Sequence, residues 1–185
     1  MRIISGKAGR IAIKVPKAVT RPTTDFVRQA VFSILGPRVE DARILDLFAG
    51  SGALGLEALS RGAASCVFVD EHRAVEKVLK ENLEKSRLEG GRMAKADVHS
   101  WVQRDNGSYD MIFVDPPYAK YPSDRDHLKE LFAKGALAQR LAEEGLMVVE
   151  QSIGEAVREG EGLKFLERRE YGSSAILLYA RAEDS

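Results

Sequence analysis

The chain has little of the chemistry that secreted or membrane-spanning proteins depend on. Its 185 residues include one cysteine, Cys66, so an internal disulfide is excluded. Cys66 lies in an apolar run with Val67 and Phe68, which predicts a small buried side chain and not a nucleophile. No apolar run approaches the roughly 20 residues that a membrane-spanning helix needs, and the first residues do not form a secretory signal. We therefore expect a cytoplasmic protein without a membrane partner.

The chain also lacks a net charge, because 28 basic residues balance 28 acidic ones. An even distribution of these charges would argue against a nucleic-acid partner. The distribution is uneven, since residues 1–28 hold seven Lys and Arg side chains and a single acid, Asp25. Such a cluster can be a solvated surface, or it can contact the phosphates of a nucleic acid. On the second interpretation, the candidate RNA-binding residues are Arg2, Lys7, Arg10, Arg21 and Arg28.

The alternation of elements predicts an α/β fold within one domain spanning residues 1–185. From residue 43 onward, short apolar runs alternate with amphipathic helical segments, which is typical of a mostly parallel sheet with helices on both faces. The segment 171–174 is too short for a crossover helix, so the last strand is expected to be antiparallel. The seven expected strands are 44–48, 66–70, 93–97, 111–115, 146–150, 164–170 and 175–180.

Residues 1–40 are expected to form a basic hairpin and a helix ahead of the catalytic core, residues 41–185. Two β-like pieces, 2–5 and 10–13, flank a glycine-containing turn. A helix is predicted from Asp25 to about Leu35, with Thr24 as its N-cap and Gly36 followed by Pro37 as its stop.

A glycine-rich loop, residues 46–55, joins the first predicted strand to a helix. It contains Gly-x-Gly-x-x-Gly, so it matches the dinucleotide-binding pattern as written. Asp46 argues against that interpretation, because a carboxylate repels a pyrophosphate but attracts the ammonium group of a methionine moiety. Gly50 and Gly52 would allow the backbone to approach a ligand without interference from a Cβ atom.

Acidic residues also follow the second and third predicted strands. Asp70 is placed to accept hydrogen bonds from both ribose hydroxyls, and Asp97 from an adenine amino group, with the N–H of Val98 beside it. Each acid alone could simply cap the following helix, but together with Asp46 they indicate an adenosyl ligand with a positive tail. The predicted ligand is S-adenosylmethionine, and its predicted contacts are Asp46, Phe48, Gly50, Ser51, Gly52, Asp70, Asp97 and Val98.

The tetrad Asp115-Pro116-Pro117-Tyr118 follows the fourth predicted strand. An exocyclic amine on a nucleobase is a poor nucleophile, because its lone pair is delocalised into the ring. The Asp115 carboxylate and the Pro116 carbonyl can accept from its two N–H bonds and aim the lone pair at a methyl group. The two prolines remove two backbone donors, and Tyr118 offers a ring on which a base can stack. These four residues are the predicted catalytic site.

No metal site is expected from the sequence. His72, His99 and His127 are scattered without the spacing of metal ligands. The reactive group belongs to the cofactor, so the protein needs to supply mainly position and orientation.

These motifs resemble those of the RsmD-type 16S rRNA guanine-N2 methyltransferases, within the class I Rossmann-like methyltransferases. The similarity covers nearly the whole chain and includes segments 2–6, 21–32, 46–52, 113–118, 148–150 and 171–172. The resemblance implies a seven-stranded Rossmann-like sheet, S-adenosylmethionine as methyl donor, and a monomer. It also implies a guanine of 16S rRNA as target, within an assembled or assembling small ribosomal subunit. The family often has Glu where this chain has Asp70, so either Asp70 or Glu71 is expected to hold the ribose.

Three other functions remain open from the sequence. An adenine-N6 methyltransferase acting on RNA or DNA shares the glycine loop and the tetrad, although 185 residues leave little room for a DNA-recognition region. An NAD-dependent oxidoreductase fits the literal glycine pattern but leaves Asp46 and the tetrad unexplained. A non-catalytic RNA-binding module accounts for the basic segment alone and predicts no cofactor affinity.

Overall fold

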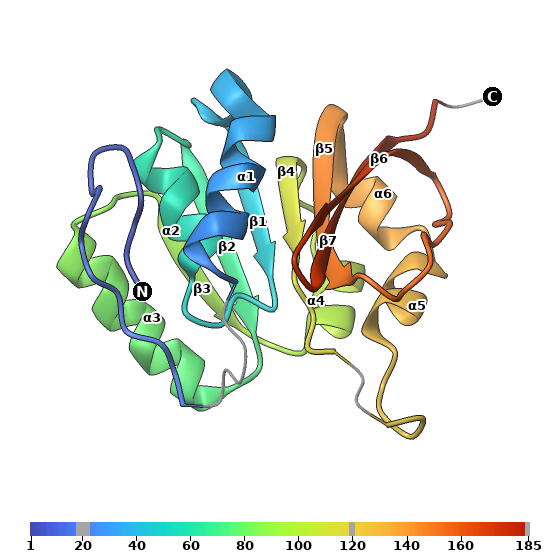
Figure 1. Cartoon of the computed structure of the whole chain (residues 1–185), viewed down its shortest axis with the longest axis horizontal. Coiled ribbons are helices and arrows are strands. Elements are labelled where there is room, and N and C mark those ends of the chain that lie inside the picture. The colour runs from blue at the N-terminus through green and yellow to red at the C-terminus, as the bar shows by residue number, and fades with distance from the viewer. Residues whose placement is uncertain (18–22, 119–120, 184–185) are drawn as a thin grey trace.

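The computed structural model describes residues 1–17, 23–118 and 121–183, which form a seven-stranded sheet between two layers of helices (Figure 1). The strand order is β3-β2-β1-β4-β5-β7-β6. All seven predicted strands are confirmed, although their ends shift and the fifth starts well before its predicted position. The strands are β1 (Arg43–Leu47), β2 (Ser65–Asp70), β3 (Gly91–Lys95), β4 (Tyr109–Val114), β5 (Leu141–Ser152), β6 (Leu163–Tyr171) and β7 (Ser174–Arg181).

The strand directions also follow the prediction. β1 pairs in parallel with β2 and β4, and parallel pairing continues from β2 to β3 and from β4 to β5. β7 runs antiparallel to both β5 and β6, because the turn at Gly172 and Ser173 reverses the chain directly after β6. The carboxyl ends of the five parallel strands therefore meet at one edge of the sheet.

The helices that cover the sheet are α1 (Asp25–Leu35), η1 (Gly36–Val39), α2 (Ala53–Ser60), α3 (Arg73–Ser86), α4 (Val98–Arg104), α5 (His127–Phe132) and α6 (Ala136–Arg140). Buried residues of α1, α2 and α3 form one apolar layer with the sheet, and those of α4, α5 and α6 form the other. Successive side chains of a strand point to opposite faces, so Ile44 joins the first layer and Leu45 the second. No helix in the described ranges is both long and apolar enough to cross a bilayer.

The N-terminal segment, residues 1–17, lies along the outside of α2 and α3 (Figure 1). The expected hairpin is present as a fold-back in which the Ile3 N–H donates to the Ile11 carbonyl at 2.9 Å, with one antiparallel bridge between Arg2 and Ala12. Regular strands do not form in this segment. The next two N–H groups after Ile3 donate to the Glu57 carboxylate of α2 instead of to the opposite arm of the fold-back.

Asn82 of α3 fastens the same segment to the glycine loop. Its Oδ1 accepts from the Lys14 N–H at 2.8 Å, and its Nδ2 donates to the Lys14 carbonyl at 2.9 Å. The same Nδ2 donates to the Ser51 carbonyl at 3.0 Å. Asn82 is 1% exposed, so one buried amide holds two segments that are distant in sequence.

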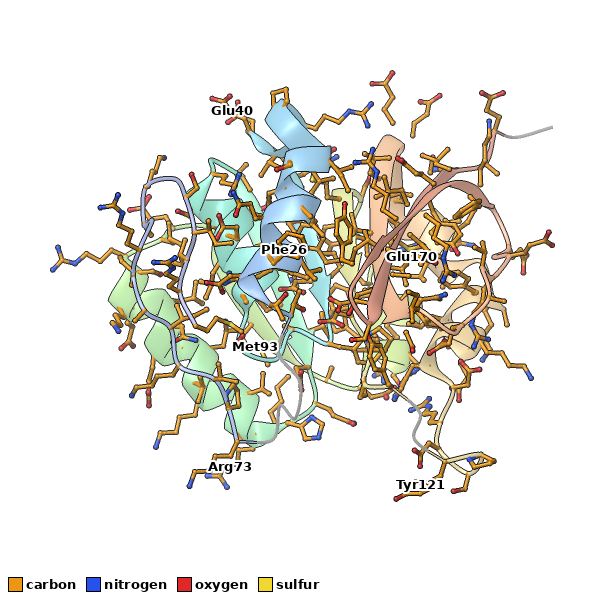
Figure 2. The ribbon with its side chains drawn as sticks, viewed as in Figure 1. Phe26, Glu40, Arg73, Met93, Tyr121 and Glu170 are labelled. Atoms are coloured by element: carbon orange, nitrogen blue, oxygen red, sulfur yellow. The ribbon has the colours of Figure 1, made fainter. Side chains whose placement is uncertain are left out.

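Helix α1 begins and ends where the sequence predicts. The Thr24 side chain accepts from the Val27 N–H at 3.2 Å, which confirms it as the N-cap. Gly36 follows the helix with a φ of 55°, in the left-handed region that favours glycine. Phe26 lies on α1 (Figure 2) and is 68% exposed. Its ring meets that of Tyr171 edge-on.

Candidate active site

A cleft of about 540 Å³ opens at the carboxyl ends of the parallel strands. From β1 the chain continues to β2 and β3 on one side of the sheet, and from β4 it continues to β5 on the other side. Open α/β sheets bind their ligands at such a switch point. Every predicted cofactor-binding and catalytic residue except Gly52 lines this cleft. The other lining residues are Thr23, Ala49, Ala53, Leu54, Glu71, His72, Val75, His127 and Glu150.

The loop after β1 adopts left-handed backbone conformations at three positions. Phe48, Gly50 and Gly52 have φ angles of 58°, 53° and 78°. Such an angle is uncommon for a residue with a side chain as large as that of Phe48. The Gly50 N–H donates to Asp70 Oδ2 at 3.1 Å, so the loop is held against the end of β2.

Gly52 has a structural role at the start of α2. It does not line the cleft, and a Cβ atom added to it would lie 2.3 Å from Cδ1 of Leu79 in α3. It is also the N-cap residue of α2. Glycine is needed here for the left-handed turn and for the close approach of Leu79 in α3, and the contact of Gly52 with the cofactor stays a prediction.

Asp46 is buried below the loop, with 2% of its surface exposed. Its Oδ2 accepts from the Gly55 N–H at 3.0 Å. Burial raises the pKa of the Asp46 carboxyl well above its usual range, and the nearby Asp115 and Asp70 raise it further, although the hydrogen bond from Gly55 opposes this shift. No Lys or Arg of the described residues forms an ion pair with Asp46. A cationic ligand would favour the ionised form of this buried carboxyl.

Asp70 organises the loop and also faces the cleft. Its Oδ2 accepts from Gly50, and its Oδ1 accepts from the His72 N–H at 3.0 Å. Nδ1 of His72 also lies 3.0 Å from Oδ1, so about one of the four lone-pair sites of the carboxylate is left for a ribose hydroxyl. Glu71 is exposed and lines the same cleft, so both acids expected to hold the ribose face it.

Asp97 combines helix capping with its place in the cleft. Its Oδ1 accepts from the Ser100 N–H at 2.9 Å, and its Oδ2 lies 3.2 Å from Nη1 of Arg125. Burial acts to raise the pKa of Asp97, but the hydrogen bonds from Ser100 and the charges of His99 and Arg125 bring it below its usual value. Asp97 is therefore an ionised acceptor beside Val98, the buried first residue of α4.

The tetrad follows β4 directly. Asp115 and Tyr118 are half-buried, Pro116 is buried and Pro117 is exposed. The hydroxyl of Tyr118 lies 3.5 Å from Oγ of Ser174. The consecutive prolines contribute carbonyl oxygens but no backbone N–H, so this turn is rich in acceptors.

Two lining residues, Thr23 and Glu150, were not among the predicted site residues. The hydroxyl of Thr23 lies 2.7 Å from Oδ2 of Asp115 and 3.1 Å from Oε2 of Glu150. Ser174 donates to Oε1 of Glu150 at 2.8 Å. Glu150 lies near the carboxyl end of β5, so a search for acids at every strand end would have found it. Thr23 precedes α1 and gives no comparable signal.

An aromatic wall borders the cleft beside the glycine loop. The Phe48 ring meets the rings of His127 and His99 edge-on, with centroids 4.9 and 6.3 Å away. The two imidazoles stack, and Nε2 of His99 lies 2.9 Å from Nδ1 of His127. Burial lowers the pKa of both histidines, and the charge of Arg125 lowers it further. At neutral pH this wall is uncharged and suits contact with a planar ring.

The basic residues of the N-terminal segment are exposed. Arg2, Lys7 and Arg10 all lie on the surface, and Arg2 makes a long ion pair of 3.6 Å with Asp25. Arg21 lies outside the described residues.

Arg28 must be removed from the predicted RNA contacts. Its side chain is fully buried, and its Nη2 donates to Asp25 Oδ1 at 2.6 Å and to the Arg2 carbonyl at 2.7 Å. Its Nη1 lies 3.7 Å from the equally buried Glu57 carboxylate. A guanidinium held in this way cannot reach a phosphate, and it fastens α1 to the N-terminal segment and to α2.

The charge of the cleft is negative. Its lining includes six acids and, in the part of the chain that the structure describes, no Lys or Arg. Such a cleft would repel a pyrophosphate, which argues against the dinucleotide interpretation of the glycine pattern. Among the described residues no group of three or more His, Cys, Asp or Glu side chains could hold a metal ion. The six acids are Asp46, Asp70, Glu71, Asp97, Asp115 and Glu150.

Solved structures identify the class to which this fold belongs. The structure titled "Putative methyltransferase yhhF from Escherichia coli" is 34% identical, has a TM-score of 0.85 and covers 98% of each chain. The seven-stranded sheet with an antiparallel last strand and the cleft at its parallel strand ends define a Rossmann-like methyltransferase.

Sequence comparisons then identify the family. The family described as "Conserved hypothetical protein 95" matches residues 1–180, and the chain belongs to this family. "Putative rRNA methyltransferase YlbH" of Bacillus subtilis is 37% identical over 188 residues, 98% of this chain and 99% of that protein. "Ribosomal RNA small subunit methyltransferase D" of Escherichia coli K12 is 38% identical over 154 residues, 83% of this chain and 75% of that protein. The resemblance to the RsmD-type family is confirmed.

Proposed function

We propose that the protein transfers a methyl group from S-adenosylmethionine to the exocyclic N2 amine of a guanine in small-subunit rRNA. One observation carries the proposal. Asp115 and the two prolines that follow it line the same cleft as Asp46 and the loop after β1. The names of the two relatives, both rRNA methyltransferases and one acting on the small subunit, support rRNA as the substrate.

The lining residues suit the proposed cofactor. S-adenosylmethionine, when bound, supplies an electrophilic methyl group on a positively charged sulfur. The buried Asp46 carboxylate would hold the cationic part of this ligand, because it has no ion-pair partner among the described Lys and Arg side chains. Asp70 or Glu71 would hold the ribose, and Asp97 with the Val98 N–H would hold the adenine.

Asp115 would orient the amine that receives the methyl group. Its carboxylate and the Pro116 carbonyl accept hydrogen bonds, so the amine would be held by its two hydrogens with its lone pair free. The Thr23 hydroxyl lies 2.7 Å from Asp115 Oδ2 and fixes the position of this carboxylate. Tyr118 would stack on the extruded base. The protein thus contributes orientation, which is the main requirement of a transfer between two bound partners.

The division of charge explains how a polyanion would use an acidic cleft. Phosphates are repelled by the six lining acids but attracted by the exposed Arg2, Lys7 and Arg10 of the N-terminal segment. A neutral base extruded from the RNA can enter the cleft while the backbone stays outside. This arrangement favours a structured RNA held at a distance, such as rRNA within a small ribosomal subunit.

The proposal is tested by mapping modified nucleotides in the rRNA of cells that lack this gene. We expect mass spectrometry to show the loss of one N2-methylguanine in small-subunit rRNA. The purified protein and S-adenosylmethionine should restore that mark on isolated subunits. Loss of N6-methyladenine instead would assign the protein to the adenine-specific alternative.

Replacing the proposed catalytic acid gives a second test. Asp115→Ala is expected to lower the single-turnover rate by roughly 100-fold or more, because the amine loses its orienting acceptor. Calorimetry should show that cofactor binding persists. The matched control is Asp110→Ala, which removes an acid from the opposite end of β4, where it binds Arg43. Normal activity in Asp115→Ala would refute the assigned role.

A further inference from the structure

Glu150 is a buried acid in the cleft to which the proposed reaction gives no role. It lies on β5, which pairs with β4 on one side and β7 on the other, and 7% of its surface is exposed. It shares the lining of the cleft with Asp115. A buried carboxylate is costly, so its presence beside the reacting position calls for an explanation.

Two hydroxyls hold Glu150, and one of them also contacts Asp115. Ser174 donates to Oε1 at 2.8 Å, and the Thr23 hydroxyl lies 3.1 Å from Oε2 and 2.7 Å from Asp115 Oδ2. A hydroxyl has a single hydrogen, so Thr23 can donate to only one of these two carboxylates at a time. The pair of carboxylates bridged by Thr23 is therefore suited to a ligand that brings N–H donors of its own.

The edge of a guanine base provides such donors side by side. Its N2 amine and its N1–H are adjacent, whereas adenine has a lone pair on N1 beside its amine. We propose that Glu150 determines specificity for guanine by accepting the N1–H bond while Asp115 accepts from the N2 amine. This inference rests on the proposed function and extends it to the choice of base.

The same arrangement would reject adenine. An adenine placed with its amine at Asp115 would turn its N1 lone pair toward the Glu150 carboxylate, so two acceptors would face each other without a hydrogen. Sites built to bond a particular N–H or O–H group discriminate strongly against analogues that lack it, since their own buried polar groups are left unpaired. Ser174 acts as a positioning residue, because its hydroxyl donates to Oε1 of Glu150, and the Thr23 hydroxyl sets the spacing of the two carboxylates between which it lies.

The test uses a base analogue that lacks the hydrogen on N1 but keeps the N2 amine. Small subunits are reconstituted with rRNA that carries either guanosine or 2-aminopurine riboside at the nucleotide identified by the mapping. 2-Aminopurine keeps the N2 amine but lacks O6 and has a lone pair on N1. Single-turnover methylation rates are measured for the wild type, for Glu150→Gln and for Glu144→Gln, a control at an exposed acid of the same strand.

The wild type should prefer guanosine by roughly 100-fold or more. Glu150→Gln should lower the guanosine rate by roughly 10- to 100-fold and reduce the preference at least tenfold, because the amide N–H can donate to the N1 lone pair of 2-aminopurine. Glu144→Gln should behave as the wild type. The inference is overturned if the wild type shows no preference, or if Glu150→Gln lowers both rates by the same factor.

A second variant covers the case in which Glu150→Gln fails to fold or to bind the cofactor. Ser174→Ala removes one of the hydroxyls that hold Glu150 and should reduce the preference several-fold with cofactor binding retained. An unchanged preference would then refute the role of Glu150. Failure of the proposed function is a separate result, because the mapping would then find no N2-methylguanine restored by the wild-type protein.

Discussion

Arg28 is among the largest fully buried side chains in the described part of the chain. Its positive charge is balanced by acidic side chains inside the protein. It contacts Asp25 and lies near Glu57, which also receives Nε of Arg61 at 2.7 Å. Two of its nitrogens, Nε and Nη1, are buried without a hydrogen bond. The residue therefore stabilises the fold only as long as its acidic partners remain in place.

Removing this guanidinium should be costly. Arg28→Ala is expected to lower the free energy of unfolding by about 3 kcal/mol, because the buried Glu57 carboxylate loses a cationic neighbour and a cavity forms. Urea denaturation measures the loss. Arg2→Ala, at a residue whose side chain is 63% exposed, is the control and should change stability by less than about 0.5 kcal/mol. A loss for Arg28→Ala as small as that of the control would contradict the structural role.

The stacked histidines should make stability depend on pH. Burial lowers the pKa of His99 and His127 in the folded state, so the unfolded chain takes up protons first on acidification. Stability is full above the unfolded pKa of about 6.5 and is lost as the pH falls toward the lower folded pKa. Unfolding free energies at pH 7.5 and 5.5 should differ less in His127→Asn than in the wild type. An equal difference in the two proteins would exclude this contribution.

At the scale of the elements, caps and glycines carry more information than composition. Thr24 and Gly36 locate both ends of α1 from the sequence, because their backbone requirements are local. The early start of β5 could not be located in this way. Glu143 and Glu144 are exposed and polar. The pairing of β4 with β5 passes from Tyr109 opposite Leu141 to Met111 opposite Leu146, so the two acids lie within this register shift. That extension depends on a neighbouring strand, which a local pattern does not show.

The start of α2 can be compared with the turn at Gly172, another glycine with a positive φ. Gly52→Ala should destabilise by about 2 to 4 kcal/mol, since the new Cβ atom adds an overlap with Leu79 to the cost of a left-handed residue. Gly172→Ala, with a φ of 60° and open space around the added atom, should cost about 1 kcal/mol. Chemical denaturation compares the two. Equal losses would show that backbone conformation alone requires Gly52.

At the scale of the whole molecule, the exposed basic residues should govern the salt dependence of RNA binding. Reversing Arg2, Lys7 and Arg10 to Glu should weaken binding to small subunits and reduce the slope of log K against log salt by about 0.7 to 0.9 per lost phosphate contact. The control reverses Lys129, Lys134 and Lys164, which are exposed on or near α5 and β6. Filter binding over a range of salt concentrations measures both slopes. An unchanged slope in the first variant would make the basic segment an ordinary solvated surface.

The site as a whole could be predicted only where chemistry and strand position coincide. Asp46, Asp70 and Asp115 each lie in or follow an apolar run, and parallel strands bring such positions to one edge of the sheet. Thr23 enters the cleft from a segment outside the sheet, and no local pattern places it there. The burial of Arg28 could not be predicted from the sequence either, because a count of charges does not show that Glu57 of α2 lies beside it.

Asn82 gives the N-terminal segment and the glycine loop a common fastening, since one side-chain amide binds the backbone at Lys14 and at Ser51. If one segment moves, the hydrogen bonds of Asn82 to the other segment must therefore change as well. Thermodynamic linkage makes such an influence mutual, so if the proposed rRNA substrate changes the affinity for S-adenosylmethionine, the cofactor changes the affinity for that substrate by the same factor. The order in which cofactor and substrate bind can then change the rate at which the ternary complex forms, but the free energy of the complex is the same for either order.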